Sequence, residues 1–243
     1  FCALGAVAAQ TPGDARRIAQ LGAGNVSVCG NLKFDVTPAP ERIALGKTWR
    51  AALGGRPVWL AASTREGEEA LVLEAWRRIA ASRALLVLVP RHPQRFAEVA
   101  ALLTRLGIDF VRRSDRLPGP ETPVWLGDSM GEMAAYYSLA DIAFIGGSLL
   151  PLGGQNLIEA AACGCPVVVG PHTFNFQQAT ADAIAAGAAL RVPDAEALVG
   201  TVCRALGDAS ELGKMRAAAT GFAASHRGAG ARTLALIRSA ITG

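Results

Sequence analysis

The chain has 243 residues, of which 51% are hydrophobic and 18% charged, a composition typical of a globular protein and too apolar for intrinsic disorder. Its formal net charge of +4 favours an anionic small molecule or an anionic membrane surface as partner. The sequence lacks the dense Lys/Arg stripes of a nucleic-acid binder, and no apolar run reaches the roughly 18 residues that span a bilayer.

The five cysteines form no CxxC pair, and Cys163 and Cys165 are too close together for the usual zinc spacing, so we predict no metal site. An odd number of cysteines without a signal peptide indicates a reducing, cytoplasmic compartment. Because the chain begins with Phe1 in what resembles the middle of a domain, we expect a C-terminal fragment of a longer protein.

The first part of the chain reads as the end of a preceding unit. We predict that residues 1–36 form the last strand and the last helix of that preceding unit. The segment "FDVTPAPER" has two prolines within three residues and predicts a linker before the first strand of a new sheet. From Ala195 to Ile241 the pattern is helical, so this tail could pack against the preceding domain.

Between these ends, short runs rich in Val, Ile and Leu alternate with amphipathic stretches such as Glu66–Ala81 and Arg95–Leu106. Continuous apolar runs are typical of parallel strands that are covered on both faces. The strands are predicted at Pro57–Ala62, Ala84–Val89, Asp109–Arg113, Val124–Leu126, Asp141–Ile145, Pro166–Val169 and Ala189–Val192. This alternation predicts an open, doubly wound α/β sheet with right-handed crossovers.

Ligands of doubly wound sheets bind at the carboxyl ends of the strands, where loops lead into helices. Polar and glycine residues follow four of the predicted strands, at residues 63–66, 90–93, 127–133 and 146–159. The sequence therefore predicts a ligand site at this edge of the sheet.

The segment "GGSLLPLGGQNLIEAAACGCPVVVG" contains the most specific signal. Gly153 and Gly154 would let the backbone approach a ligand, and Asn156 would open a helix over Leu157–Cys163 whose N-terminus favours a phosphate. Glu159 lies on the same helical face and could accept hydrogen bonds from the two vicinal hydroxyls of a ribose. An ordinary N-cap with an acidic residue in the first turn is the simpler alternative.

Arg91, held between prolines, suits a phosphate or a carboxylate, although a solvated surface arginine is the alternative. His92 could contact ligand or be structural, and Met133 could pack on a base or in the core. Lys33, just before the linker, could stabilise charge on a leaving phosphate from an interdomain cleft. No hydrolase triad or glycosidase dyad is evident.

Five segments carry a resemblance to a known family: "GNLKFD", "ASTREGEE", "VPRHPQRF", "GDSMGEMAAYYSLADIAFIGGSL" and "GGQNLIEAAACGCPVVVGPHTFNF". In this order, from about Gln10 to Gln178, they resemble the 3-deoxy-D-manno-octulosonic acid (Kdo) transferases of lipopolysaccharide synthesis. The resemblance implies a GT-B glycosyltransferase built from two Rossmann-like domains. Residues 1–37 would end the N-terminal acceptor domain, 38–194 would form the Rossmann-like CMP-Kdo-binding domain, and 195–243 would be C-terminal helices.

The activity that the resemblance implies is inverting, metal-independent transfer of Kdo from CMP-Kdo to a lipid A precursor, lipid IVA, without a cofactor. The reaction would take place at the cytoplasmic face of the inner membrane, with membrane contact made through the absent N-terminal part. The family's general base, a glutamate, lies in that N-terminal domain. We therefore expect the fragment alone to bind CMP weakly and to transfer nothing.

By resemblance, Lys33 would help to stabilise the transition state. The residues expected to bind CMP are Pro90, Arg91, Gly131, Glu132, Met133, Asn156, Leu157, Ile158 and Glu159. Further candidates are Ser63, His92, Ser148, Gly153 and Gly154. A UDP-sugar epimerase of GT-B architecture and a non-catalytic nucleotide-binding module are the alternatives.

Overall fold

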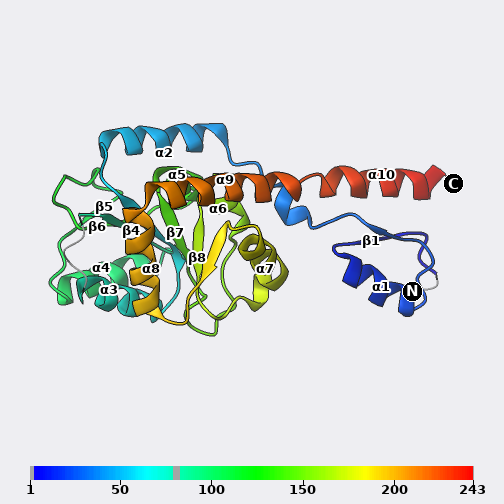
Figure 1. Cartoon of the computed structure of the whole chain (residues 1–243), viewed down its shortest axis with the longest axis horizontal. Coiled ribbons are helices and arrows are strands. Elements are labelled where there is room, and N and C mark those ends of the chain that lie inside the picture. Colours follow the sequence, from blue (N-terminus) through cyan, green and yellow to red (C-terminus); the bar gives the residue numbers. More distant parts are fainter. Residues whose placement is uncertain (1–2, 79–82, 243) are drawn as a thin grey trace. The chain divides into compact units, whose positions relative to one another are not determined.

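The computed structural model describes residues 3–78 and 83–242 of the chain. It divides into two compact units (Figure 1). Unit 1 comprises Phe1–Thr37 and Ala223–Gly243, and unit 2 comprises Pro38–Phe222. The functional roles that the sequence suggests for residues 1–37, 38–194 and 195–243 remain predictions.

Unit 2 is built on a sheet of seven parallel strands in the order β5-β6-β4-β3-β7-β8-β9, which confirms the predicted doubly wound α/β fold. The strands are β3 (Val58–Thr64), β4 (Leu85–Pro90), β5 (Phe110–Arg112), β6 (Val124–Leu126), β7 (Ile142–Ile145), β8 (Val167–Val169) and β9 (Ala189–Arg191). Each coincides with a predicted strand. The central strands are almost wholly inaccessible to solvent, as their continuous apolar sequences require.

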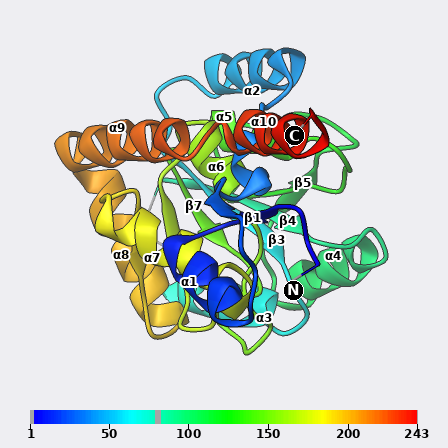
Figure 2. The ribbon, with the colours of Figure 1, turned by 90° about the vertical axis from the view of Figure 1, so that its right-hand side faces the viewer.

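Helices cover both faces of this sheet (Figures 1 and 2). The helices α3 (Glu68–Arg78), α4 (Arg95–Arg105) and α8 (Ala195–Gly207) lie on one side, and α5 (Met133–Leu139) and α6 (Ile158–Ala162) lie on the other. Helix α7 (Gln177–Ala185), which follows the short 3-10 helix η2 (Phe174–Phe176), packs beside β9. Residues 79–81 of the predicted helix Glu66–Ala81 lie outside the described residues.

A helix precedes the sheet where none was predicted. Residues 40–52 form α2 (Pro40–Ala52), so the prediction that "FDVTPAPER" is a linker was wrong for its last three residues. Pro40 occupies the first turn, where the missing backbone N–H costs no helical hydrogen bond. Helix α2 packs closely on α5: a Cβ added at Gly46 would lie 2.2 Å from the carbonyl oxygen of Ala135.

The strand order reverses between β3 and β7. From β3 the chain crosses to β4 on one side, whereas β7, on the other side of β3, leads outward to β8 and β9. In doubly wound sheets the loops that leave such a reversal diverge to opposite faces and leave a crevice at the carboxyl edge. We call this place the switch point, defined by the loops that follow β3 (residues 65–67) and β7 (residues 146–157).

Unit 1 contains a parallel pair, β1 (Val7–Ala9) and β2 (Val26–Val28), joined by α1 (Pro12–Gln20). The prediction of a single strand in residues 1–36 was therefore wrong, because two strands flank the helix. Thr11 caps α1 by accepting a hydrogen bond from the backbone N–H of Asp14 at 3.0 Å.

The predicted helical tail is confirmed as α8, α9 (Ala209–Ser225) and α10 (Ala229–Thr242). In unit 1 the carboxylate of Asp35, at the end of the 3-10 helix η1 (Leu32–Asp35), accepts hydrogen bonds from the backbone N–H groups of Gly230 and Gly228. These bonds lower the pKa of Asp35. They join the start of α10 to the N-terminal segment.

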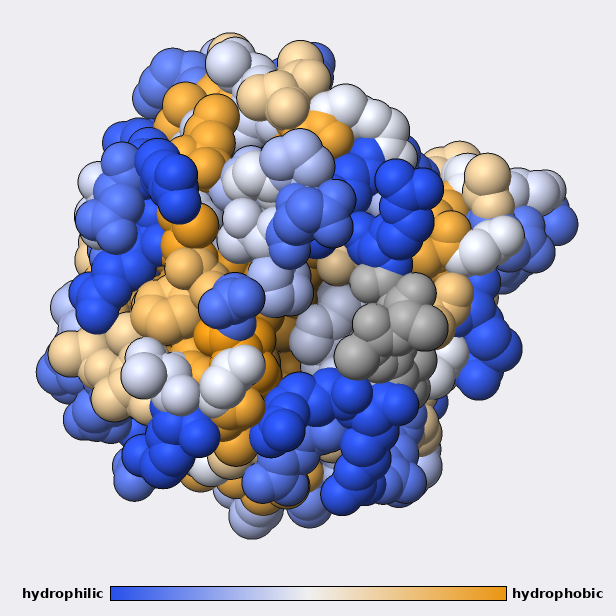
Figure 3. All heavy atoms as spheres, turned by 90° about the vertical axis from the view of Figure 1, so that its left-hand side faces the viewer, coloured by the Kyte–Doolittle hydropathy of each residue, from blue (hydrophilic) through white to orange (hydrophobic). Residues whose placement is uncertain are grey.

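The surface of the molecule on the left-hand side of Figure 1 is mostly hydrophilic, with an apolar area between the charged side chains (Figure 3). A hollow of about 870 Å³ lies where strands of unit 2 begin, lined by residues that include Pro57, Trp76, Pro118 and Pro123. Among the described residues, no helix combines the length and the apolar character needed to cross a membrane.

Candidate functional site

The backbone at the end of β3 touches the start of the loop that follows β7. A Cβ added at Gly146 would lie 2.4 Å from the carbonyl oxygen of Ser63, so only glycine fits there. Ser63 itself has a φ of 55°, in the left-handed region of backbone conformation that residues other than Gly, Asn and Asp rarely adopt. The candidate Ser63 therefore lies near the end of β3, at an irregularity of the strand, where it contacts the start of the loop after β7.

A buried carboxylate joins the two switch-point loops. Glu68, the first residue of α3, is fully buried and accepts hydrogen bonds from three backbone N–H groups. These donors are Arg65 (2.9 Å) in the loop after β3, and Gly147 (2.6 Å) and Leu149 (3.0 Å) in the loop after β7. Sequence reasoning missed Glu68, because the residues considered after the first strand ended at Glu66.

The glycine-rich part of the second loop folds back onto its beginning. The backbone N–H of Gly154 donates to the carbonyl of Gly147 (2.7 Å), and that of Gln155 donates to Gly146 (2.9 Å). Gly153 and Gly154 both have positive φ, of 88° and 75°. The loop thus has one defined backbone path rather than a flexible one.

The reason for glycine at position 153 differs from the expected one. A Cβ there would lie 2.3 Å from Nδ2 of Asn175 and 2.6 Å from the ring of Phe174, so the space is filled by the protein itself. The hydroxyl of Ser148 also forms its hydrogen bonds within the protein. This buried hydroxyl donates to the carbonyl of Ile145 and accepts the backbone N–H of Gly170 (2.8 Å).

Arg91 lies beside this loop. It follows β4, and its backbone N–H donates to the carbonyl of Thr64 (3.0 Å), which ties it to the end of β3. Its exposed guanidinium donates through Nε to Oε1 of Gln155 (3.3 Å), and no carboxylate of the described residues lies within ion-pair distance. Pro90 is buried at the end of β4, and the partly buried His92 accepts the backbone N–H of Arg95.

Helix α6 begins at Ile158, one residue later than predicted. Asn156 does bind its first turn: Oδ1 accepts the backbone N–H of Ile158 at 2.9 Å. Leu157 and Ile158 are each 1% exposed, so their side chains lie in the core and only their backbone could face a ligand.

Glu159 is the free carboxylate of this group. It is partly buried, and among the described residues no group donates a hydrogen bond to it. Burial raises its pKa, because the charged form loses contact with water and gains no partner. Such a carboxylate is set to accept hydrogen bonds from a bound molecule.

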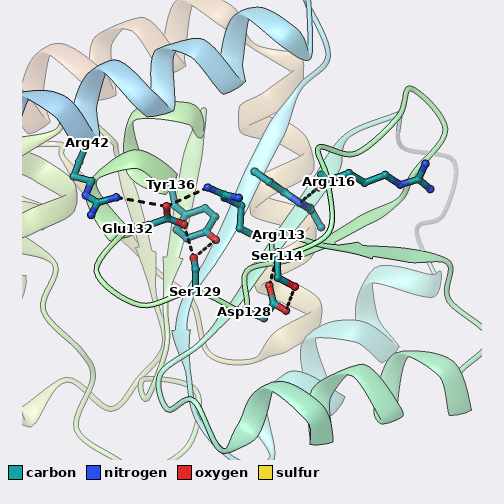
Figure 4. Close-up of polar contacts among 9 residues, drawn as sticks. Arg42, Arg113, Ser114, Arg116, Asp128, Ser129, Glu132 and Tyr136 are labelled. Atoms are coloured by element: carbon teal, nitrogen blue, oxygen red, sulfur yellow. Dashed lines mark hydrogen bonds and ion pairs between the residues drawn. The ribbon is translucent and has the colours of Figure 1, made fainter.

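The loop after β6 carries Gly131, Glu132 and Met133, the last of which begins α5. Glu132 is 9% exposed, and its carboxylate is bound on both oxygens (Figure 4). Oε1 accepts from Arg113 Nη2 (3.2 Å) and pairs with Arg42 Nη1 (3.5 Å), while Oε2 accepts from the hydroxyl of Ser129 (2.5 Å).

Further contacts extend this cluster. The Ser129 hydroxyl also lies 2.8 Å from the hydroxyl of Tyr136, and the guanidinium of Arg113 stacks over the ring of Trp49 at 4.8 Å. We call Arg42, Arg113, Ser129, Glu132 and Tyr136 the Glu132 cluster. Because the carboxylate of Glu132 is occupied, we expect this loop to offer a ligand its backbone groups, at Gly131 to Met133, and the side chain of Met133.

The site residues thus fall into two groups. Hydrogen bonds connect the end of β3 with the loops after β4 and β7. They bring together Ser63, Arg91, Ser148, Gly153 and Gly154, and Glu159 follows in α6. The loop after β6 leaves the same edge of the sheet, since β6 is the neighbour of β4. Lys33 belongs to unit 1, where its backbone N–H donates to Oδ1 of Asn31, and its role remains a prediction.

Comparisons with known proteins show what the chain and its fold are similar to. The 3-deoxy-D-manno-octulosonic acid transferase of Bordetella pertussis is 50% identical over 94% of this chain and 55% of its own length. A crystal structure of the C-terminal CMP-Kdo binding domain of WaaA from Acinetobacter baumannii is 34% identical, with a TM-score of 0.69, over 79% of this chain and 98% of that domain. HepE of Anabaena, solved with UDP-glucose, matches at 15% identity with a TM-score of 0.59, covers 98% of this chain and 64% of HepE, and supports the GT-B fold alone.

No protein-family model matches the chain. The chain spans about half the length of the curated relatives it matches. The chain covers almost all of the WaaA domain at 34% identity, so the sequence comparison and the structural comparison identify the same group of proteins. The chain belongs to the family of 3-deoxy-D-manno-octulosonic acid transferases.

Proposed function

We propose that unit 2 binds CMP-Kdo at the carboxyl edge of its sheet, in the crevice bordered by the loops after β3, β4, β6 and β7. The likeness to the CMP-Kdo binding domain of WaaA supports this ligand. The position supports it as well, because sheets of this kind bind nucleotides at the switch point.

The single observation that carries the proposal is the state of Glu159. Its carboxylate is partly buried, has a raised pKa and receives no hydrogen bond from the described residues. The two vicinal hydroxyls of a ribose would supply the missing donors. Binding would then compensate the desolvation that the free protein leaves uncompensated.

The phosphate of CMP would lie against Arg91. The contact with Gln155 uses Nε of its guanidinium and leaves the two terminal nitrogens for a phosphate. Asn156 has its Oδ1 engaged by Ile158, so its Nδ2 group would donate to the ligand. Negative charge grows on this phosphate as the bond to the sugar breaks, and each fixed donor would lower the barrier by about 3 kcal/mol.

We further propose that the complete protein transfers Kdo to a lipid A precursor with inversion, at the cytoplasmic face of the inner membrane. In that reaction Lys33 would stabilise the leaving phosphate, and a glutamate outside this chain would be the general base. These assignments follow the family resemblance. Lys33 is exposed in η1, which is compatible with a contact to ligand.

Isothermal titration calorimetry with CMP, UMP, UDP and GDP tests the proposed ligand on the chain as it stands. We expect saturable binding of CMP and weaker binding of the other three nucleotides. Preferential binding of UDP would instead favour the epimerase alternative. Failure to bind any nucleotide would contradict the proposal.

A further inference from the structure

Glu68 has an unusual environment for a buried carboxylate. It is fully inaccessible to solvent, yet its hydrogen-bond partners within the described part of the chain are three backbone N–H groups and no cation. The N-terminus of α3, where Glu68 is the first residue, supplies further favourable dipoles. A buried charge that is held in this way keeps its surroundings in one arrangement, because any loosened N–H would leave the charge unpaired.

The contacts of Glu68 lead to the proposed ligand residues in a short chain of hydrogen bonds. Glu68 holds the N–H of Gly147, whose carbonyl in turn accepts the N–H of Gly154. The next residue, Gln155, is bound through its backbone to Gly146 and through its side chain to Arg91. Displacement of Gly147 would therefore move the partner that orients Arg91.

We propose that Glu68 is a positioning residue, which organises the switch-point loops for the nucleotide without touching it. This inference rests on the proposed function. Its carboxylate sets the path of residues 146–149 against the loop after β3. That path fixes Gln155, and with it the guanidinium of Arg91. The two loops contain many glycines and would otherwise sample several conformations.

Asp141 provides a matched control at the other edge of the sheet. It is a buried carboxylate that accepts the backbone N–H of Val58 (2.8 Å) and pairs with Arg50 (3.1 Å) and Arg216. Asp141 directly precedes β7 and Val58 begins β3, whereas the nucleotide is proposed where those strands end. A change at Asp141 removes a similar buried network without reaching the switch-point loops.

The test compares Glu68→Gln, Glu68→Asp and Asp141→Asn in the whole chain. Glu68→Gln puts an amide group among N–H donors, so we expect CMP affinity to fall about 10-fold and the amides of residues 147–155 to exchange faster with deuterium. Glu68→Asp keeps the charge on a shorter side chain and should give intermediate effects. Asp141→Asn should lower the melting temperature and leave CMP affinity and the exchange of residues 147–155 unchanged.

Hydrogen exchange separates this proposal from the proposed function, because it is measured without nucleotide. If wild type fails to bind CMP but the loop amides respond to Glu68→Gln, the proposed ligand is wrong and the positioning role stands. Unchanged loop exchange and unchanged CMP affinity in folded Glu68→Gln would overturn the positioning role. If Glu68→Gln does not fold, Glu68→Asp decides by the same two measurements.

Discussion

Glu132 and Glu159 look alike in the sequence, since each follows a glycine-containing loop and stands at or near the start of a short helix. In the structure they differ. Glu132 binds two arginines and a serine, whereas Glu159 receives no hydrogen bond from the described residues. A carboxylate that is satisfied by its own protein stabilises the fold. One that is partly buried and unsatisfied costs stability in the free protein and is available to a ligand.

The substitution Glu159→Gln tests this difference between the two glutamates with the largest expected effect. We expect CMP affinity to fall about 100-fold, since hydrogen bonds to a charged acceptor contribute about 1.5–3 kcal/mol each. The melting temperature of the free chain should rise, because an uncompensated charge is removed. Calorimetric titration and thermal unfolding measure the two effects. Unchanged affinity, or a fall in melting temperature, would contradict the role given to Glu159.

Glu132→Gln should act in the opposite direction on stability. Removing the charge leaves Arg113, held over Trp49, without its carboxylate, and we expect a loss of about 2 kcal/mol in the free energy of unfolding. For a chain of this size that lowers the melting temperature by about 4–8 °C. CMP affinity should change much less than in Glu159→Gln.

The two arginines give an internal control for the Glu132 cluster. Arg113 lies closer to the carboxylate (3.2 Å) and its side chain is 29% exposed, whereas Arg42 lies at 3.5 Å and is 41% exposed. Arg113→Gln should therefore lower the melting temperature more than Arg42→Gln does. Equal losses would contradict the larger contribution expected of Arg113.

Arg91→Ala should reduce CMP affinity about 10-fold, because a phosphate loses a charged donor. Arg91 is exposed and forms no ion pair with the described residues, so the melting temperature should not change. Arg91→Lys keeps the charge but not the planar fork, and should recover part of the affinity. The comparison of CMP with cytidine checks the assignment: cytidine, which lacks the phosphate, should bind wild type and Arg91→Ala equally.

The smallest effect is a pH dependence of stability. Because burial raises the pKa of Glu159 above its ordinary value of 4.5, the folded chain holds a proton that the unfolded chain has released in the window between the two values. The protonated Glu159 side chain leaves the full stability of the folded chain intact below pH 4.5. This part of the free energy of unfolding is lost as the pH rises through the raised pKa of Glu159. The stability gained by Glu159→Gln should therefore grow with pH in urea unfolding. A gain that is constant or shrinks would contradict the raised pKa.

The sheet could be predicted from the sequence because strands buried on both faces leave continuous apolar runs, as in β4, "LLVLVP". Helix α2 was missed because prolines at 38 and 40 read as a linker, although Pro40 suits a first helical turn. Because Arg91 follows β4, and Asn156 and Glu159 follow β7, their place at the carboxyl edge of the sheet could also be predicted from the sequence.

The pairing of side chains was not predictable in the same way. Arg113 and Glu132 meet only because β5 and β6 are neighbours in the sheet, and no local pattern encodes that contact. Glu68 could have been found by following the loop after the first strand into the first turn of its helix, where a glutamate often binds backbone N–H groups. Its bonds to Gly147 and Leu149 depend on the strand order.

The most direct test is a crystal structure of this chain with CMP. The account predicts the ribose hydroxyls on the Glu159 carboxylate, the phosphate on the guanidinium of Arg91, and the Glu132 cluster unchanged from the free protein. A nucleotide bound elsewhere, with residues 153–159 facing solvent, would contradict it.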